Sequence, residues 1–221
     1  MERRDPERAD PITRLVASRV RALRTERGMS GAALGAAVHA LGLHSWVAST
    51  VGKLETMRRE ALTIREVIAL AVALDVPLPW LLADPEAGTA VPITRDVAVD
   101  PWRAMLWMVG KEPLTDPPGP AWDHAALPIR QACQVATLVE RFGQLRTHRE
   151  NVAALLPDGQ DADRAEEDAR LERRVLEDLA RPLSALLRLG YPPPLLPDDL
   201  IQRAVELDVE LPARDGEVEP S

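Results

Sequence analysis

The sequence predicts an all-α protein, with a five-helix domain over residues 12–84 and then a helical domain that contains a long helical hairpin. Three observations lead to this fold class. Ala, Leu and Arg are abundant and favour helices, whereas aromatic residues make up only 3% of the chain. Apolar residues recur at spacings of three and four along most of the sequence. Residues that start and stop helices separate these periodic segments.

The first two helices of the five-helix domain are marked by their ends. An apolar stripe that starts at Ile12 predicts the first helix, which Gly28 ends. Ser30 is a good N-cap for a second helix, and Gly42 ends it. This second helix is rich in small residues, so we expect another helix to approach it closely.

The third and fourth helices follow the same logic. Ser45 is expected to cap the third, with Trp46 anchoring its start. The expected buried stripe of the third helix is Val47, Val51 and Leu54. Thr63 is expected to cap the fourth helix, and the residues expected to fill the core from it are Ile64, Val67, Ile68 and Ala71. A final half-helix, with Trp80 in the core, closes the domain.

The rest of the chain is predicted more coarsely. Residues 1–11 are expected to form an N-terminal arm, 85–100 a linker with a possible short strand at its end, and 211–221 a disordered acidic tail. The helical domain between them, residues 101–210, contains long helices over 127–156 and 162–189. The apolar face expected on the second long helix is Leu171, Val175, Leu179, Leu183, Leu186 and Leu187. Pro182 is expected to kink that helix or to start a new one, and Asp198 or Asp199 to cap a last helix.

Composition limits the class of protein. The single cysteine, Cys133, excludes an intramolecular disulfide and is expected to be buried. The charged N-terminus lacks the apolar core of a signal peptide, and the apolar runs are too short to span a membrane, so we expect a cytoplasmic protein without membrane contact. The net charge is −8, but residues 1–84 carry 12 basic against 10 acidic residues. Only this N-terminal part is therefore suited to approach a phosphate backbone.

The stretches RVRALRTERGMSGAAL, VGKLE and ALTIREVIALAVALDVPLPWLL, within residues 12–84, resemble the Xre-type, lambda-repressor-like family of helix-turn-helix regulators. Within that family they are most similar to the BldD-like regulators. The resemblance covers about a third of the chain. It implies a five-helix DNA-binding domain whose third helix enters the major groove of double-stranded DNA. It also implies a structural ion pair between Arg24 and Glu55.

The resemblance and the periodicity together place the DNA-contacting residues on the third helix and around it. The expected set is Gly31, Ala48, Ser49, Thr50, Gly52, Lys53, Thr56, Arg58 and Arg59. Ser49 and Thr50 can hydrogen-bond base edges, and Ala48 can meet a thymine methyl group. Arg58 and Arg59 are suited to phosphate contacts that position the domain.

Two features depart from the family pattern. Gly31 stands where the family often has a Gln that contacts phosphate, and the connection over residues 39–44 is about four residues longer than usual. Its histidines, His39 and His44, are expected to face solvent. Sequence recognition is therefore expected to be relaxed or to depend on DNA shape.

The sequence shows no pattern that is typical of an enzyme or of a self-cleaving repressor. Self-cleavage at Ala87-Gly88 needs a downstream serine nucleophile with a suitably placed lysine base, and the spacing of Ser184 and Lys111 is wrong for it. Phosphate loops, metal-ligand clusters and catalytic triads are not recognisable. We therefore expect no enzyme activity, no catalytic residue, no metal and no cofactor.

The function predicted from the sequence is a sequence-specific transcriptional regulator that binds double-stranded DNA as a homodimer. The second half is expected to supply dimerisation and to offer a site for a protein partner or a small-molecule effector. Trp102, Trp107 and Trp122 are expected in a core or a dimer interface, with a ligand pocket as the alternative. The alternative function is a protein-interaction module, which binds a sigma factor or another regulator through a degenerate helix-turn-helix domain.

Overall fold

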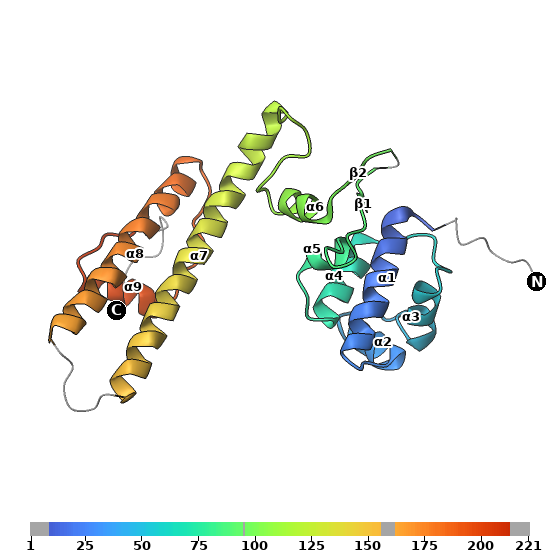
Figure 1. Cartoon of the computed structure of the whole chain (residues 1–221), viewed down its shortest axis with the longest axis horizontal. Helices are drawn as coiled ribbons and strands as arrows, with labels where there is room; N and C mark the ends of the chain where they lie inside the picture. The colour runs from blue at the N-terminus through green and yellow to red at the C-terminus, as the bar shows by residue number, and fades with distance from the viewer. Residues whose placement is uncertain (1–8, 95, 156–161, 213–221) are drawn as a thin grey trace, which may run out of the picture. The chain divides into compact units, whose positions relative to one another are not determined.

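The computed structural model describes residues 9–94, 96–155 and 162–212 (Figure 1). These residues are mostly helical and include one two-stranded antiparallel sheet, so the all-α class is confirmed apart from that small hairpin. They fall into two compact units divided between Asp116 and Pro117, and each unit is described by itself. Within the described ranges, no helix is long and apolar enough to cross a membrane. The predicted arm and acidic tail lie almost entirely outside the described residues.

Five helices open the first unit: α1 (Pro11–Glu26), α2 (Gly31–Ala40), α3 (Ala48–Glu55), α4 (Ile64–Ala73) and α5 (Leu78–Leu82). Their ends follow local chemistry. The Ser30 side chain accepts a hydrogen bond from Ala33 N, and Thr63 and Glu66 form a reciprocal capping box at the start of α4. Gly28 follows α1 with a φ of 61°, a backbone conformation that glycine adopts without strain.

A single hydrophobic cluster lies among these five helices. Its fully buried members come from all five segments and include Val16, Leu34, Trp46, Leu54, Leu70 and Leu81. Trp46 has no exposed surface, so its indole belongs to the core and does more than anchor the start of α3. Trp80 is partly buried and packs against the same cluster, as predicted.

Four expectations for residues of α3 and α4 were wrong. Val47 is 50% exposed, because it is the extended N-cap of α3 and lies ahead of its buried stripe; Ser45 therefore does not cap the helix. Ile64 and Ile68 are 68% and 47% exposed. Val67 and Ala71 are buried as predicted, and Leu70 and Leu74 are buried in place of Ile64 and Ile68.

The segment predicted as a linker packs on the first unit. Strands β1 (Val91–Pro92) and β2 (Ala98–Val99) form a hairpin, and α6 (Pro101–Met108) follows it. Ala83, Val91 and Ala104 make a small second cluster, which also includes Leu15 of α1. The boundary between the units therefore lies after α6 and not within residues 85–100.

The second unit is a helical hairpin with one further helix. Its members are α7 (Pro120–Leu155), α8 (Ala162–Arg188) and α9 (Asp198–Glu206). Figure 1 shows α7 and α8 running side by side. Their core includes Val135, Leu138, Phe142, Leu176, Leu179 and Leu183, and α9 adds Leu200 and Ala204. Cys133 on α7 is only partly buried.

Three details of the second unit differ from the sequence prediction, and one predicted alternative is excluded. α7 begins at Pro120, ahead of the predicted start. α8 continues through Pro182, which excludes the alternative that this residue starts a new helix. Pro197 is the N-cap of α9, and Asp198 and Asp199 lie in its first turn. Two members of the predicted apolar face of α8, Leu171 and Leu187, are 39% and 37% exposed.

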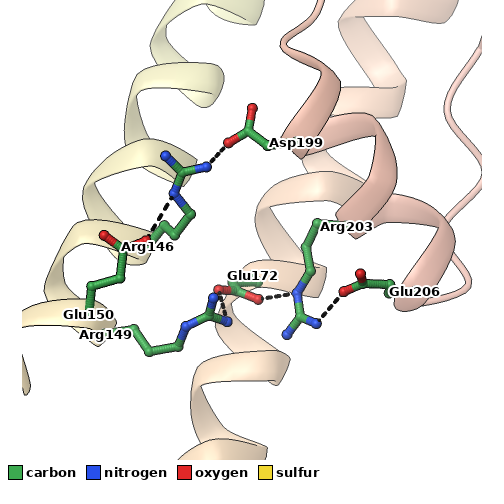
Figure 2. A network of polar contacts seen from close by, with 7 residues as sticks. All are labelled: Arg146, Arg149, Glu150, Glu172, Asp199, Arg203 and Glu206. Carbon is green, nitrogen blue, oxygen red and sulfur yellow. Dashed lines mark hydrogen bonds and ion pairs between the residues drawn. The ribbon is translucent and has the colours of Figure 1, made fainter. Parts of the chain in front are cut away.

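A network of charged side chains joins the three helices of the second unit (Figure 2). Glu172 of α8 is only 2% exposed, and its carboxylate lies 2.9 Å from Arg149 Nη1 of α7 and 2.7 Å from Arg203 Nε of α9. Arg146 of α7 pairs with Asp199 of α9. α9 is therefore held on the hairpin by ion pairs as well as by apolar contacts.

Candidate nucleic-acid interface

The close approach of α2 and α3 depends on Gly35. A Cβ atom at this position would lie 2.7 Å from the carbonyl carbon of Val47 and 3.0 Å from the backbone nitrogen of Ala48. Both distances are shorter than ordinary van der Waals contact. The glycine therefore lets the start of α3 rest directly on α2, as the small residues of α2 predicted.

α3 has one buried face and one exposed face. Val51 and Leu54 are 1% and 0% exposed and fix the helix in the core. The exposed positions on its other side are Ala48, Ser49, Gly52 and Lys53. We call these four residues the α3 face. All four belong to the larger set of residues that the sequence predicted for contact with DNA.

An ion pair attaches the end of α3 to α1. Arg24 Nε lies 2.6 Å from Glu55 Oε1, and Arg24 Nη2 donates to Glu55 Oε2 at 2.9 Å. Arg24 Nη1 donates to the carbonyl of Met29 at 2.7 Å. The hydrogen bond to Glu55 raises the pKa of Arg24, which favours the charged guanidinium in this contact. The structural ion pair implied by the family resemblance is therefore present.

The hydroxyl groups of the two predicted threonines are already engaged. Thr50 Oγ1 donates to the carbonyl of Ser45 at 2.9 Å, and Thr56 Oγ1 donates to the carbonyl of Gly52 at 2.6 Å. Their hydrogens are therefore directed at the protein backbone. Either oxygen keeps lone pairs with which it can accept a hydrogen bond from a base.

Arg59, which was predicted to contact phosphate, is engaged within the protein. Its Nη2 lies 2.7 Å from Glu66 Oε1, and its guanidinium carbon lies 5.3 Å from the centre of the Trp46 ring. Its side chain is 24% exposed. Arg59 thus binds within the protein, because a buried carboxylate and an aromatic face compete for its charge. Arg58, by contrast, is exposed beside the α3 face.

Glu66 is a structural residue that the sequence reasoning missed. Its buried carboxylate accepts hydrogen bonds from Trp46 Nε1 at 3.0 Å, Arg59 Nη2 at 2.7 Å and Thr63 N at 2.9 Å. Burial opposes ionisation, but these hydrogen bonds outweigh it and hold the pKa of Glu66 below its usual value. Trp46 precedes α3 and Arg59 follows it, so one carboxylate ties both ends of the helix to α4. The capping-box spacing of Thr63 and Glu66 was the available signal.

Two other predicted features lie next to α3. Gly31 is the first residue of α2, and a Cβ there would lie 3.7 Å from Val51 Cγ1, an ordinary contact, so a larger residue fits. In the connection between α2 and α3, His39 Nδ1 lies 3.1 Å from the carbonyl oxygen of His44, and the two rings are 4.8 Å apart. Both histidines are exposed, as predicted, and this contact folds the connection on itself.

The predicted aromatic cluster of the second half is divided between the units. Trp102 lies on α6 and is 56% exposed, and Trp107 on the same helix is partly buried, both in the first unit. Trp122 lies on α7 in the second unit. The expectation of one core or interface built from all three is therefore not met within a single unit.

Comparison with known proteins gives no relative. No protein-family model, curated protein or solved structure matches the chain. The α3 face and the contacts that support it are therefore the observations on which a function can be proposed.

Proposed function

We propose that this protein is a transcriptional regulator of the Xre type, which binds double-stranded DNA as a homodimer through the α3 face. The observation that carries the proposal is a short helix with one exposed face, packed against α2 at Gly35. The Arg24–Glu55 and Arg59–Glu66 ion pairs hold its C-terminal end, and the Trp46–Glu66 hydrogen bond holds its start. Such rigid support is what a helix needs to present side chains to base edges with a defined register.

The α3 face suits close approach to a major groove. The groove is about 12 Å wide, close to the diameter of a helix with its side chains. Because Ala48, Ser49 and Gly52 are small, the backbone of α3 can lie deep in such a groove. Ser49 can exchange hydrogen bonds with base edges, the Ala48 methyl can contact thymine, and Lys53 can reach guanine or a phosphate.

Charge supports a modest phosphate contribution. Lys53 and Arg58 are both exposed, and the backbone nitrogen of Arg58 donates to the carbonyl of Lys53 at 2.8 Å, whereas Arg59 is bound to Glu66. Two phosphate contacts per subunit give a homodimer a slope of roughly −3.6 for log K against log salt. This dependence is weaker than that of strongly basic DNA-binding proteins, in keeping with the small positive excess of residues 1–84.

Sequence discrimination on this face rests on few hydrogen bonds. The α3 face lacks Arg, Gln and Asn, the residues that bind guanine or adenine with two hydrogen bonds. Recognition is then expected to combine thymine-methyl contacts with the shape and flexibility of the operator. A homodimer would place two α3 helices about 34 Å apart on one face of a near-palindromic site.

The decisive experiment selects binding sites for the full chain from random duplexes and then titrates the selected duplex at several salt concentrations. Lys53→Ala and Arg58→Ala should each weaken binding and reduce the salt slope by about one per subunit, or about two per homodimer. Lys111→Ala and Arg188→Ala are matched controls, because both residues are exposed and lie far along the chain from α3. Failure to enrich any sequence would refute the proposal, and so would unchanged salt dependence of both variants on the selected duplex.

One observation favours a second candidate, a protein-interaction module. The α3 face offers no residue that reads bases with two hydrogen bonds, and Arg59 is engaged inside the protein. A degenerate helix-turn-helix domain that binds a sigma factor or another regulator has the same features. The titration separates the two functions, because this alternative predicts no saturable duplex binding even at low salt.

A further inference from the structure

The solvent side of α4 is apolar. The exposed positions of this helix are Ile64, Arg65, Ile68 and Val72, and its other positions are buried or partly buried. Ile64, Ile68 and Val72 are 68%, 47% and 59% exposed, and we call them the α4 stripe. A surface helix normally directs polar residues to water, so this stripe is the reverse of the expected pattern.

The α4 stripe has no role in the core of its own unit. Val67, Leu70, Ala71 and Leu74 already pack among the five helices. The stripe residues follow one another at intervals of four, so they form a nearly straight row about 12 Å long on the outside of the helix. A row of this kind is typical of a helix that packs against another helix.

The charges at the two ends of the stripe have opposite signs. Arg65 is exposed next to Ile64, and Asp75 is exposed just after the end of the helix. If two α4 helices pack antiparallel with Ile64 opposite Val72, Arg65 of each copy lies about one helical turn from Asp75 of the other, within reach of its long side chain. The charges then attract each other on both sides of the contact.

The exposed apolar pair on α9 provides a contrast. Ile201 and Val205 are 45% and 75% exposed, but Asp198 and Asp208 lie at the two ends of that pair. Self-association of α9 would bring carboxylates together in either orientation. Of these two apolar helix faces, the α4 stripe is therefore the one whose charges suit a second copy of itself.

We propose that the α4 stripe is a contact surface between two copies of this chain. The helices pack antiparallel about a two-fold axis, so that Ile68 of one copy meets Ile68 of the other, and Ile64 meets Val72. Such a contact is isologous, which means that each copy uses the same surface. The inference rests on the proposed homodimer and deepens it by naming where its first units meet.

The contact is small. A patch of three aliphatic side chains offers at most a few hundred Å² of apolar surface, about half or less of the roughly 800 Å² that each partner buries in a standard stable interface. The stripe alone is therefore expected to give a weak association, which a second contact or a shared DNA duplex would strengthen. Cross-linking is the suitable measurement, because it captures weak contacts that size-exclusion chromatography misses.

The test uses the full chain with Cys133→Ser, so that an introduced cysteine is the only one. Ile68→Cys and Val97→Cys are compared without DNA, because both native residues are 47% exposed and lie in the same unit. Under mild oxidation, Ile68→Cys should form a disulfide between copies at least about tenfold faster, since the contact raises the local concentration of the two thiols. Equal rates for the two variants would overturn the proposal. They are the result expected if another protein, or another part of the same chain, covers the stripe.

The charges give a second readout in the same background. Arg65→Glu or Asp75→Lys alone should slow cross-linking at position 68 about two- to fivefold, as expected for two exposed ion pairs, and the double variant should restore the rate. Circular dichroism confirms that each variant is folded. A double variant slower than both single variants would overturn the antiparallel arrangement. Because no DNA is present, failure here leaves the DNA-binding proposal to its own test.

Discussion

A single methyl group added at Gly35 should separate α3 from α2. The new Cβ atom would lie 2.7 Å from the carbonyl carbon of Val47, whereas carbon atoms in favourable contact lie about 3.5–4.0 Å apart. The neighbours are backbone atoms, so no side chain can rotate away. The two helices must therefore move apart by roughly 1 Å, and the core residues of α3 move with them.

The size of the effect follows from two opposing contributions. Overpacking of this kind costs about 1–3 kcal/mol, and the better helix propensity of alanine returns up to about 1 kcal/mol. Gly35→Ala should therefore destabilise the first unit by about 1–2 kcal/mol. Gly52→Ala is the matched variant, because no atom lies within 4 Å of a Cβ at that position. It should stabilise the unit by about 0.5–1 kcal/mol, the propensity contribution alone.

Tryptophan fluorescence during urea unfolding measures this difference. Of the five tryptophans, all but Trp122 lie in the first unit, so the signal reports mainly on that unit. The two alanine variants should shift the unfolding midpoint in opposite directions. If Gly35→Ala is as stable as the parent chain, the inferred close approach of α2 and α3 is wrong.

Three further outcomes are expected. The pKa of Glu66 is lower in the folded state, so the ionised carboxylate stabilises the fold above the unfolded value near 4.5, and this contribution is lost as the pH falls through the folded value. In Glu66→Gln, the free energy of unfolding measured by tryptophan fluorescence should therefore depend less on pH over that range. Glu172→Gln should lower the free energy of unfolding by about 2 kcal/mol, because two arginines lose a buried partner. Glu166→Gln breaks only an exposed pair, so its loss of stability in the same thermal unfolding, followed by circular dichroism, should be smaller. Ser30→Ala should cost about 1 kcal/mol through loss of the α2 cap, and an unchanged urea midpoint would contradict that role.

Several helix ends of the first unit were predicted correctly. Gly28, Ser30 and Thr63 act through chemistry within their own turn, so the sequence alone is enough to place them. The pair of Arg24 and Glu55 spans 31 positions, and it was expected only because the chain resembles a family that has it. Distant contacts of this kind leave no periodic signal.

The face that α4 directs inward could not be predicted from spacing. Its sequence IREVIALAVA has apolar residues on every side, so two stripes with helical spacing compete. The sequence favoured Ile64 and Ile68, whereas the structure buries Leu70 and Leu74 in their place. The choice depends on where neighbouring helices lie, which no local pattern records.

The exposed positions of the candidate site could be predicted from the sequence, but the contacts of its charged residues could not. The exposed positions Ala48, Ser49, Gly52 and Lys53 agree with the periodicity of α3. The contacts of Arg59 with Trp46 and Glu66 could not be predicted, because its sequence neighbours give no sign that these residues lie beside it in the fold. An arginine that follows α3 in the sequence can therefore bind within the protein core and not at its surface.

If the α3 face binds DNA as proposed, the separation of supporting and exposed residues on α3 makes this helix a suitable scaffold for altered DNA specificity. The contacts that hold the helix come from Val51, Leu54 and Glu55, together with flanking residues, and none of these belongs to the α3 face. Libraries that vary Ala48, Ser49, Gly52 and Lys53 together should therefore retain the fold in most members. New operator preferences could then be selected from this chain without redesign of its core.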